Sequence, residues 1–135
     1  MIAQPVVGLE QMRTPRGNVA RFAVRDDTTD YLTVNACCAE DEYGLADLTL
    51  TGWAMDVGAH IGGVAVALLV DNPDLRVIAI EALPENVAML RQNVDLNGIA
   101  DRAVIIEGAA DHGSEAVSIK YGDGLGGDFG RQHSY

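Results

Sequence analysis

Apolar residues fall into separate runs along the chain, and from residue 48 onward these runs predict strands and helices in alternation. Leu48–Met55 is apolar and β-prone, which is typical of a strand, and Val64–Val70 is an unbroken apolar run that predicts a buried helix. The residues between them, Asp56-Val57-Gly58-Ala59-His60-Ile61-Gly62-Gly63, are therefore interpreted as a strand-to-helix turn. Glycines at positions 58 and 62 permit backbone angles that a Cβ disfavours, and they let the main chain lie close to a ligand.

The same alternation continues beyond this turn. Arg76–Ile80 and Ala103–Ile106 are nearly continuous apolar runs of strand length, as expected where helices cover both faces of a parallel sheet. A helix is predicted between them, from Pro84 to the stop signal Asn97-Gly98. The order strand, helix, strand, helix, strand predicts two right-handed βαβ units, and hence an α/β fold with a Rossmann-like parallel sheet.

The N-terminal third of the chain has weaker patterns. Residues 1–16 contain turn formers and no sustained period, so we interpret them as a surface arm. Asn18–Arg25 alternates polar and apolar positions, and Tyr31–Val34 is a second short β-prone run after a polar turn cluster. Together these two runs predict an antiparallel β-hairpin. Residues 38–47 favour a short acidic helix broken at Gly44.

These patterns divide the chain into three segments. Residues 1–47 would form an arm, the β-hairpin and the short helix. Residues 48–121 would form the parallel α/β unit, with one more alternating strand at Ala116–Tyr121. Residues 122–135 are rich in glycine and poor in apolar residues, which predicts a flexible tail.

Composition narrows the class of function. The 135 residues suffice for one domain at most, and 48% apolar residues indicate a globular chain. A net charge of −11 would repel a phosphate backbone, so nucleic acid is not expected as a partner. The longest uncharged apolar run, Ile61–Val70, is far shorter than the roughly 20 residues of a membrane span. No membrane partner and no secretory signal are expected.

Cysteine and histidine positions indicate no metal site. Cys37 and Cys38 are adjacent, a spacing that rarely closes a disulfide and does not match a metal-ligand motif. His112 and His133 have no recognisable spacing either. We therefore expect reduced thiols in a cytoplasmic protein.

Polar features stand at the carboxyl ends of the predicted strands, where ligands bind in sheets of this kind. They are Asp56 with its glycines, Glu81, and Gly108-Ala109. Glu81 follows Gly62 by 19 residues, where a carboxylate can accept hydrogen bonds from both hydroxyls of a ribose. Alternatively, Glu81 is a solvated cap of the next helix, and Asp56 is a turn residue that binds local N–H groups. Two acids that each close an apolar strand favour the ligand site.

Three segments of the chain resemble a known family. They are Asp56–Gly63, then Val77-Ile78-Ala79-Ile80-Glu81-Ala82-Leu83-Pro84-Glu85-Asn86, then Asn93-Val94-Asp95-Leu96-Asn97-Gly98. They are similar to the first half of class I S-adenosylmethionine-dependent methyltransferases, and within that class to the FkbM-like O-methyltransferases. The resemblance covers about residues 51–121. It implies that residues 48–121 are the cofactor-binding half of a methyltransferase domain, with S-adenosyl-L-methionine as cofactor and a small-molecule or sugar-like acceptor.

The resemblance also implies roles for individual residues. Asp56 would face the methionine amino end of the cofactor, directly or through water. Glu81 would hold the ribose hydroxyls, with Ala82-Leu83 against one face of the adenine, and Gly108-Ala109 would border the adenine edge. The residues that would line the turn beneath the methionine and the ribose are Gly58, Ala59, His60 and Gly62.

His60 departs from the commoner form of the first motif, which has a glycine at this position. FkbM-like sequences often carry Asn or His there. A role for His60 as a catalytic base or metal ligand is not favoured, because no second ligand lies near it in sequence. The sequence identifies no catalytic residues, since acceptor-side residues normally come from the second half of this fold.

The resemblance reaches only part of the family's fold. A complete domain has seven strands, whereas the core-forming sequence here ends after the third parallel strand and its extension, so the pattern does not decide whether the chain is active as an enzyme. In the family's strand order, the strand that ends at Asp56 is central and its far edge would be bare. We expect that edge to be covered by the 18–34 hairpin, by a second copy of the chain, or by a separate chain.

Two other functions stay open at this point. The chain could be a non-catalytic module that binds S-adenosylmethionine or serves in assembly. It could also be an NAD-binding domain, because a glycine turn followed by an acid about 20 residues later occurs in both classes. Against NAD, the glycine spacing is Gly-x-x-x-Gly instead of Gly-x-Gly-x-x-Gly, and Asp56 precedes it.

Overall fold

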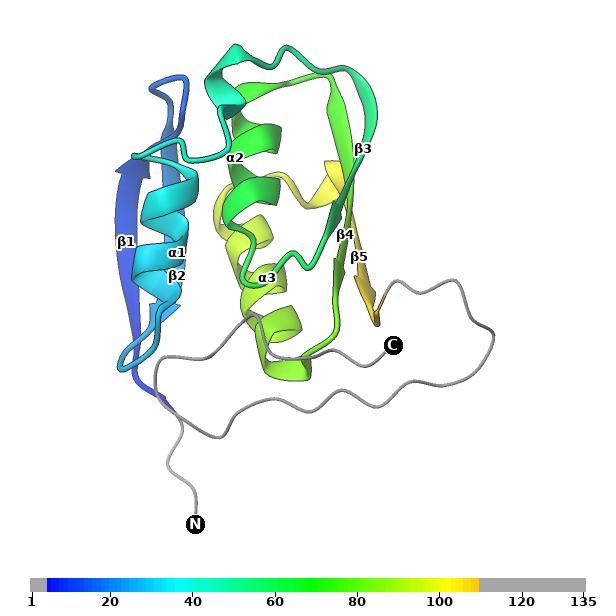
Figure 1. The fold of residues 1–135 in the computed structure, drawn as a ribbon. Coiled ribbons are helices and arrows are strands. Elements are labelled where there is room, and N and C mark those ends of the chain that lie inside the picture. The colour runs from blue at the N-terminus through cyan, green and yellow to red at the C-terminus, as the bar shows by residue number, and fades with distance from the viewer. Residues whose placement is uncertain (1–4, 110–135) are drawn as a thin grey trace.

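The computed structural model describes residues 5–109, which form three layers (Figure 1). The first layer holds an antiparallel hairpin of β1 (Val7–Arg13) and β2 (Val19–Arg25), together with α1 (Asp30–Cys37). The middle layer holds α2 (Gly63–Asp71) and α3 (Pro84–Leu96). The third layer is a sheet of β3 (Gly52–Val57), β4 (Leu75–Glu81) and β5 (Ala103–Glu107). Short 3₁₀ helices span Leu45–Asp47 and Ala100–Arg102.

The sheet of β3, β4 and β5 is parallel, with β4 in the centre. Val57 pairs with Ile80, and Glu81 pairs with Glu107, so the three strands end at the same edge of the sheet. This arrangement confirms the expected α/β fold with a Rossmann-like parallel sheet and an N-terminal hairpin. The carboxyl ends of the strands are therefore the edge where a ligand site is expected.

The core lies between the sheet and the hairpin, around α2 and α3. Ile61, Leu69 and Leu90 are completely buried, and Phe22 reaches the same core from β2. Burial of each such side chain contributes about 2 kcal/mol to the free energy of unfolding. The hairpin is thus an integral part of the packed structure.

The strand expected over Asn18–Arg25 is confirmed as β2, but its partner in the hairpin is not the one expected. Residues 1–16, interpreted as a surface arm, include β1, and β1 is the partner of β2. Most of its side chains are exposed, Leu9 by 69%, so burial imposed no alternation on its sequence. Tyr31–Val34 was expected to be a strand and lies in α1. This expectation was wrong because the segment packs as a helix against α2, which buries Val34 and Cys37. The two helices lie so close that a Cβ added to Gly63 would be 2.9 Å from Cys37 Sγ.

Two further local expectations differ from the structure. The acidic helix expected over residues 38–47 is limited to the 3₁₀ turn Leu45–Asp47, because Asp41 accepts hydrogen bonds from the backbone N–H groups of Leu45 and Ala46 and forms a turn instead. β3 begins at Gly52, not at Leu48. Leu48–Thr51 stay outside the sheet and contact Asn72 and Arg16, which bind the backbone of Leu50 and Leu48.

In the described residues, helices cover one face of the parallel sheet only, which corrects the expectation of two covered faces (Figure 1). On the other face, apolar side chains stand in rows across the strands and are between 45% and 61% exposed: Trp53, Met55, Val57, Val104 and Ile106. Within this part of the chain β3 has β4 as its one neighbour, so its outer edge is bare as expected. The hairpin packs on α3 and α2 and does not cover that edge. A second copy of the chain and a separate chain stay predictions.

Both cysteines are free thiols in the structure. Cys37 and Cys38 are buried, and burial raises the pKa of these thiols to about 11 and about 12.

Between residues 5 and 109, no helix has the length and apolar character to cross a bilayer. The strand expected at Ala116–Tyr121 and the tail from residue 122 lie outside the described residues.

Candidate functional site

The three strand ends and the glycine turn meet at one edge of the sheet. The backbone N–H groups of Gly58 and Ala59 both donate to the carbonyl of Ile80, each at 2.9 Å. The N–H of Gly108 donates to the carbonyl of Glu81, also at 2.9 Å. These bonds join the loops that follow β3 and β5 to the end of β4, so the predicted site residues are neighbours on one side of the molecule.

The turn after β3 has the left-handed backbone that its glycines were expected to permit. The φ angles of Gly58, His60 and Gly62 are +76°, +54° and +102°. At Gly62 an added Cβ would lie 2.9 Å from Leu90 Cδ1, so the Leu90 side chain would have to move, and the φ angle of +102° disfavours any residue with a Cβ. At Gly58 no atom of residues 5–109 lies within 4 Å of such a Cβ, so in this part of the chain the glycine leaves open space beside the turn. That space is where a ligand could approach the main chain.

Asn93 on α3 holds the turn from below. Its side chain is completely buried and donates to the carbonyls of Ile61, at 2.8 Å, and Ala23, at 3.2 Å. It also accepts a 2.6 Å bond from the N–H of Ala23. One amide thus joins the turn, α3 and β2, and makes the turn rigid.

Glu81 joins the turn after β3 to the loop between β4 and α3. The residue is only 7% exposed, so it is not a solvated cap. Oε1 accepts the N–H of His60 at 2.8 Å, and Oε2 accepts the N–H of Leu83 at 2.9 Å just before α3. Asn86 Nδ2 lies 3.4 Å from Oε2. A carboxylate has about four lone-pair positions, so capacity is left for further donors such as hydroxyls.

Asp56 carries a poorly compensated charge. Burial raises the pKa of its carboxyl group to about 6, the backbone N–H of Ala65 opposes this rise, and the charge of Glu81 adds to it. Its Oδ2 atom is buried and has no hydrogen-bond partner among the described residues. The alternative in which Asp56 only binds local N–H groups leaves this oxygen unexplained. A buried carboxylate oxygen without a donor is well suited to an ammonium group of a ligand.

His60 contributes its backbone and its ring to different contacts. The N–H binds Glu81, while the ring Nε2 lies 3.6 Å from Asp30 Oδ1. Burial lowers the pKa of His60, although the charges of Asp30 and Glu81 oppose this shift. The ring is therefore neutral at pH 7. Across the described residues no group of three His, Cys, Asp or Glu side chains could hold a metal ion.

The remaining predicted residues occupy the same edge. Ala82-Leu83 follow Glu81 directly, and Gly108-Ala109 follow β5, and all four are half-buried. Their backbone is tied to the site by the bonds of Leu83 and Gly108 to Glu81. Any contact of these residues with an adenine ring stays a prediction.

Three residues near the site were not identified from the sequence. They are Arg25 at the end of β2, Asp30 at the start of α1, and Asn86 in the first turn of α3. Arg25 and Asp30 form a buried ion pair at 2.8 Å, and Arg25 also binds Asn86. The turn-like composition around Asp30 concealed its role, and no spacing in the sequence connects Arg25 with a residue 61 positions later.

Comparisons with known proteins agree on the fold. No protein-family model matches the chain. The release factor glutamine methyltransferase of Chlorobaculum tepidum is 29% identical over 75 residues, which are 56% of this chain and 24% of that protein. Among solved structures, TYW2 of P. horikoshii in complex with MeSAdo has a TM-score of 0.63 and 19% identity, over 80% of this chain and 38% of that one. The mitomycin 7-O-methyltransferase MmcR has a TM-score of 0.51 and 25% identity, over 59% and 23%.

These likenesses show that the described residues have the fold of class I S-adenosylmethionine-dependent methyltransferases. The chain spans about a quarter of the length of the curated relative it matches.

Proposed function

We propose that this chain binds S-adenosyl-L-methionine at the carboxyl edge of its parallel sheet and forms the cofactor-binding half of a methyltransferase. The observation that carries the proposal is the placement of two acids around the glycine turn. Asp56 has a buried oxygen that lacks a donor, and Glu81 is bound to the N–H of the same turn. The methyltransferase fold and the methyltransferase relative support this proposal.

The residues present fit the cofactor group by group. The methionine ammonium would supply the donor that Asp56 Oδ2 lacks. The ribose hydroxyls would use the remaining lone pairs of Glu81, whose orientation is already set by two backbone N–H groups. The open space beside Gly58 would admit the ligand close to the main chain. Ala82-Leu83 and Gly108-Ala109 would border the adenine, as the resemblance implies.

The bound cofactor would supply a methyl group on a sulfonium, which moves in line to an acceptor atom. The residues of this chain bind and orient the cofactor, and alignment of this kind supplies much of the acceleration in such a transfer. No acceptor-side base is assigned among the described residues. For the acceptor we propose a hydroxyl of a small molecule or sugar-like compound, of the FkbM-like type, on the basis of the motif from Asp56 to Gly63. One structural relative is named as an O-methyltransferase, which supports oxygen as the acceptor atom.

Two alternatives are separated by ligand binding and turnover. In the NAD alternative, the same acid would hold a nicotinamide dinucleotide. In the module alternative, the chain binds the adenosyl ligand but transfers no methyl group. The buried Asp56 oxygen favours the methyltransferase over NAD, because an ammonium is the group it lacks and NAD has none.

Titration calorimetry on the full chain tests this proposal. We expect S-adenosylhomocysteine to bind and NAD to give no heat of binding under the same conditions. Binding of NAD alone would overturn the proposal and favour a dinucleotide domain. Binding of S-adenosylhomocysteine, with no methyl transfer from S-adenosylmethionine to a panel of hydroxyl compounds, would favour the non-catalytic module.

A further inference from the structure

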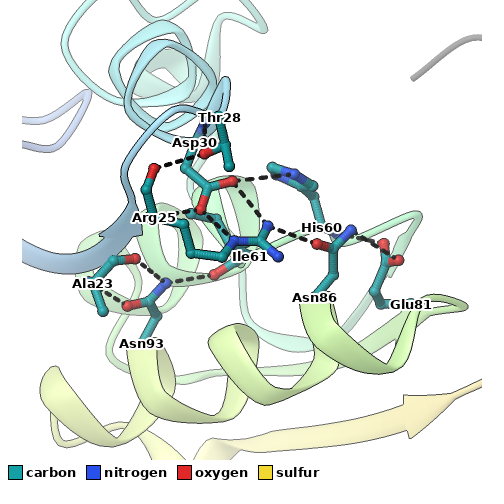
Figure 2. A network of polar contacts seen from close by, with 9 residues as sticks. All are labelled: Ala23, Arg25, Thr28, Asp30, His60, Ile61, Glu81, Asn86 and Asn93. Carbon is teal, nitrogen blue, oxygen red and sulfur yellow. Dashed lines mark hydrogen bonds and ion pairs between the residues drawn. The ribbon is translucent and has the colours of Figure 1, made fainter. Parts of the chain in front are cut away.

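Five polar residues form a ring of contacts beside the proposed cofactor site, which His60 completes through both its side chain and its backbone N–H (Figure 2). They are Arg25, Asp30, His60, Asn86 and Glu81. Arg25 and Asp30 come from the N-terminal layer. His60 lies in the turn after β3, Glu81 ends β4, and Asn86 lies in the first turn of α3. The ring therefore links the N-terminal layer to Glu81 along two routes, one through Asn86 and one through His60.

Arg25 and Asp30 form the rigid part of this ring. Arg25 donates three hydrogen bonds to the carboxylate of Asp30: from Nε at 2.8 Å, from Nη2 at 3.0 Å and from its backbone N–H at 2.9 Å. Asp30 is completely buried. Burial alone would raise the pKa of Asp30, but the hydrogen bonds and charge of Arg25 outweigh it and lower the pKa. The pair is therefore ionised at neutral pH and is held in one geometry.

The first route to Glu81 passes through the amide of Asn86. Arg25 Nη2 lies 2.7 Å from Asn86 Oδ1, and a guanidinium can only donate, so the amide oxygen must face Arg25. The amide nitrogen is then directed at Glu81 Oε2, 3.4 Å away. The guanidinium thus selects the orientation in which Asn86 offers Glu81 a donor.

The second route passes through His60. Its ring lies 3.6 Å from Asp30 Oδ1, and its backbone N–H donates to Glu81 Oε1 at 2.8 Å. Contact of the ring with a buried, fixed carboxylate restrains the residue whose N–H holds Glu81. Both oxygens of Glu81 are in this way oriented by groups that Arg25 and Asp30 fix.

We propose that Arg25 and Asp30 are positioning residues for the ribose of the cofactor: through Asn86 and His60 they hold Glu81 in the orientation that accepts the ribose hydroxyls. This inference rests on the proposed function. The competing explanation is that the ring only fastens the N-terminal layer to the rest of the chain.

A second polar cluster provides a matched control for that explanation. Asp71, at the end of α2 far from the turn, binds Thr14 Oγ1 at 2.5 Å, the N–H of Arg16 at 3.1 Å and Asn18 Nδ2 at 2.8 Å. It fastens the same N-terminal layer but includes none of the proposed site residues. Loss of one of its bonds should loosen the layer without acting on Glu81.

The test compares two ligands on four forms of the full chain. The ligands are S-adenosylhomocysteine and its 2′,3′-dideoxy analogue, which lacks the hydroxyls that Glu81 would hold. The variants are Arg25→Lys, which keeps the charge but loses the fork that reaches both partners, Asn86→Ala, and the control Asn18→Ala. We expect Arg25→Lys and Asn86→Ala to weaken S-adenosylhomocysteine binding about fivefold to tenfold and to leave the analogue unchanged. We expect Asn18→Ala to change neither affinity.

Each other outcome is decisive. An equal loss for both ligands, or no loss in variants whose circular dichroism matches the wild type, would show that the ring is only structural. Asn86→Ala keeps the test valid if Arg25→Lys does not fold, because it leaves the buried ion pair intact. A wild-type chain that binds neither ligand would refute the proposed function, and this inference with it.

Discussion

We expect Glu81→Ala to weaken the binding of S-adenosylhomocysteine by at least about 100-fold. The variant loses two hydrogen bonds from ribose hydroxyls to a charged carboxylate, each worth about 1.5–3 kcal/mol. It also frees the N–H groups of His60 and Leu83 that now bind the two oxygens. Titration calorimetry at neutral pH measures the affinity directly.

Two further variants make this prediction specific. Glu81→Gln retains the shape and one acceptor, so we expect a smaller loss of about tenfold. Glu85→Ala removes the same charge from an exposed position in the first turn of α3 and should leave the affinity unchanged. An equal loss in Glu85→Ala and Glu81→Ala would mean that net charge alone acts, and the assignment of Glu81 to the ribose would be wrong.

Asp56→Asn should stabilise the protein at pH 7 while it weakens cofactor binding. The carboxyl pKa of about 6 in the folded chain is above the unfolded value of about 3.9. Between these values the folded state binds more protons, so stability from this group falls as pH rises and is lowest above pH 6. The difference between these two pKa values corresponds to about 3 kcal/mol in the free energy of unfolding. After the cost of a buried amide, we expect a gain of about 1–2 kcal/mol in the free energy of unfolding, measured by urea denaturation.

Binding of the ligand should show the opposite pH dependence at the same residue. The ionised carboxylate would hold the methionine ammonium, so wild-type affinity for S-adenosylhomocysteine should fall about tenfold between pH 7 and pH 5 as Asp56 becomes protonated. Asp56→Asn should bind more weakly at pH 7 and lose this pH dependence. Asp71→Asn is the matched control: this buried acid has three partners, so its substitution should lower stability instead. Destabilisation by Asp56→Asn as well would contradict an uncompensated charge at this position.

The parallel sheet was predictable because its signals are local. Apolar runs of strand length that end at Asp56 and Glu81 indicate strands packed in a sheet. The turn requires positive φ angles at Gly58 and Gly62, which glycine adopts without steric cost. The N-terminal layer gave no such signal. β1 is largely exposed, and Tyr31–Val34 has β-prone residues that become helical because α1 packs on α2. In that segment tertiary contacts outweighed local propensity.

The positions of Asp56 and Glu81 in the candidate site were predictable from the sequence, whereas the residues that support Glu81 were not. Sequence patterns placed Asp56 and Glu81 at strand ends, and the structure brings the turn and Glu81 into direct contact. The support of Glu81 by Arg25 and Asn86 could not be inferred, because it depends on how the hairpin packs beside α3. The raised pKa of Asp56 likewise follows from burial, which is a property of the folded chain.

A crystal structure of the chain with S-adenosylhomocysteine would show directly whether Asp56 and Glu81 hold the cofactor. We expect both ribose hydroxyls within hydrogen-bond distance of Glu81, and the amino group of the ligand beside Asp56 Oδ2. A ligand bound elsewhere, or bound at this edge with its ribose turned away from Glu81, would contradict this expectation.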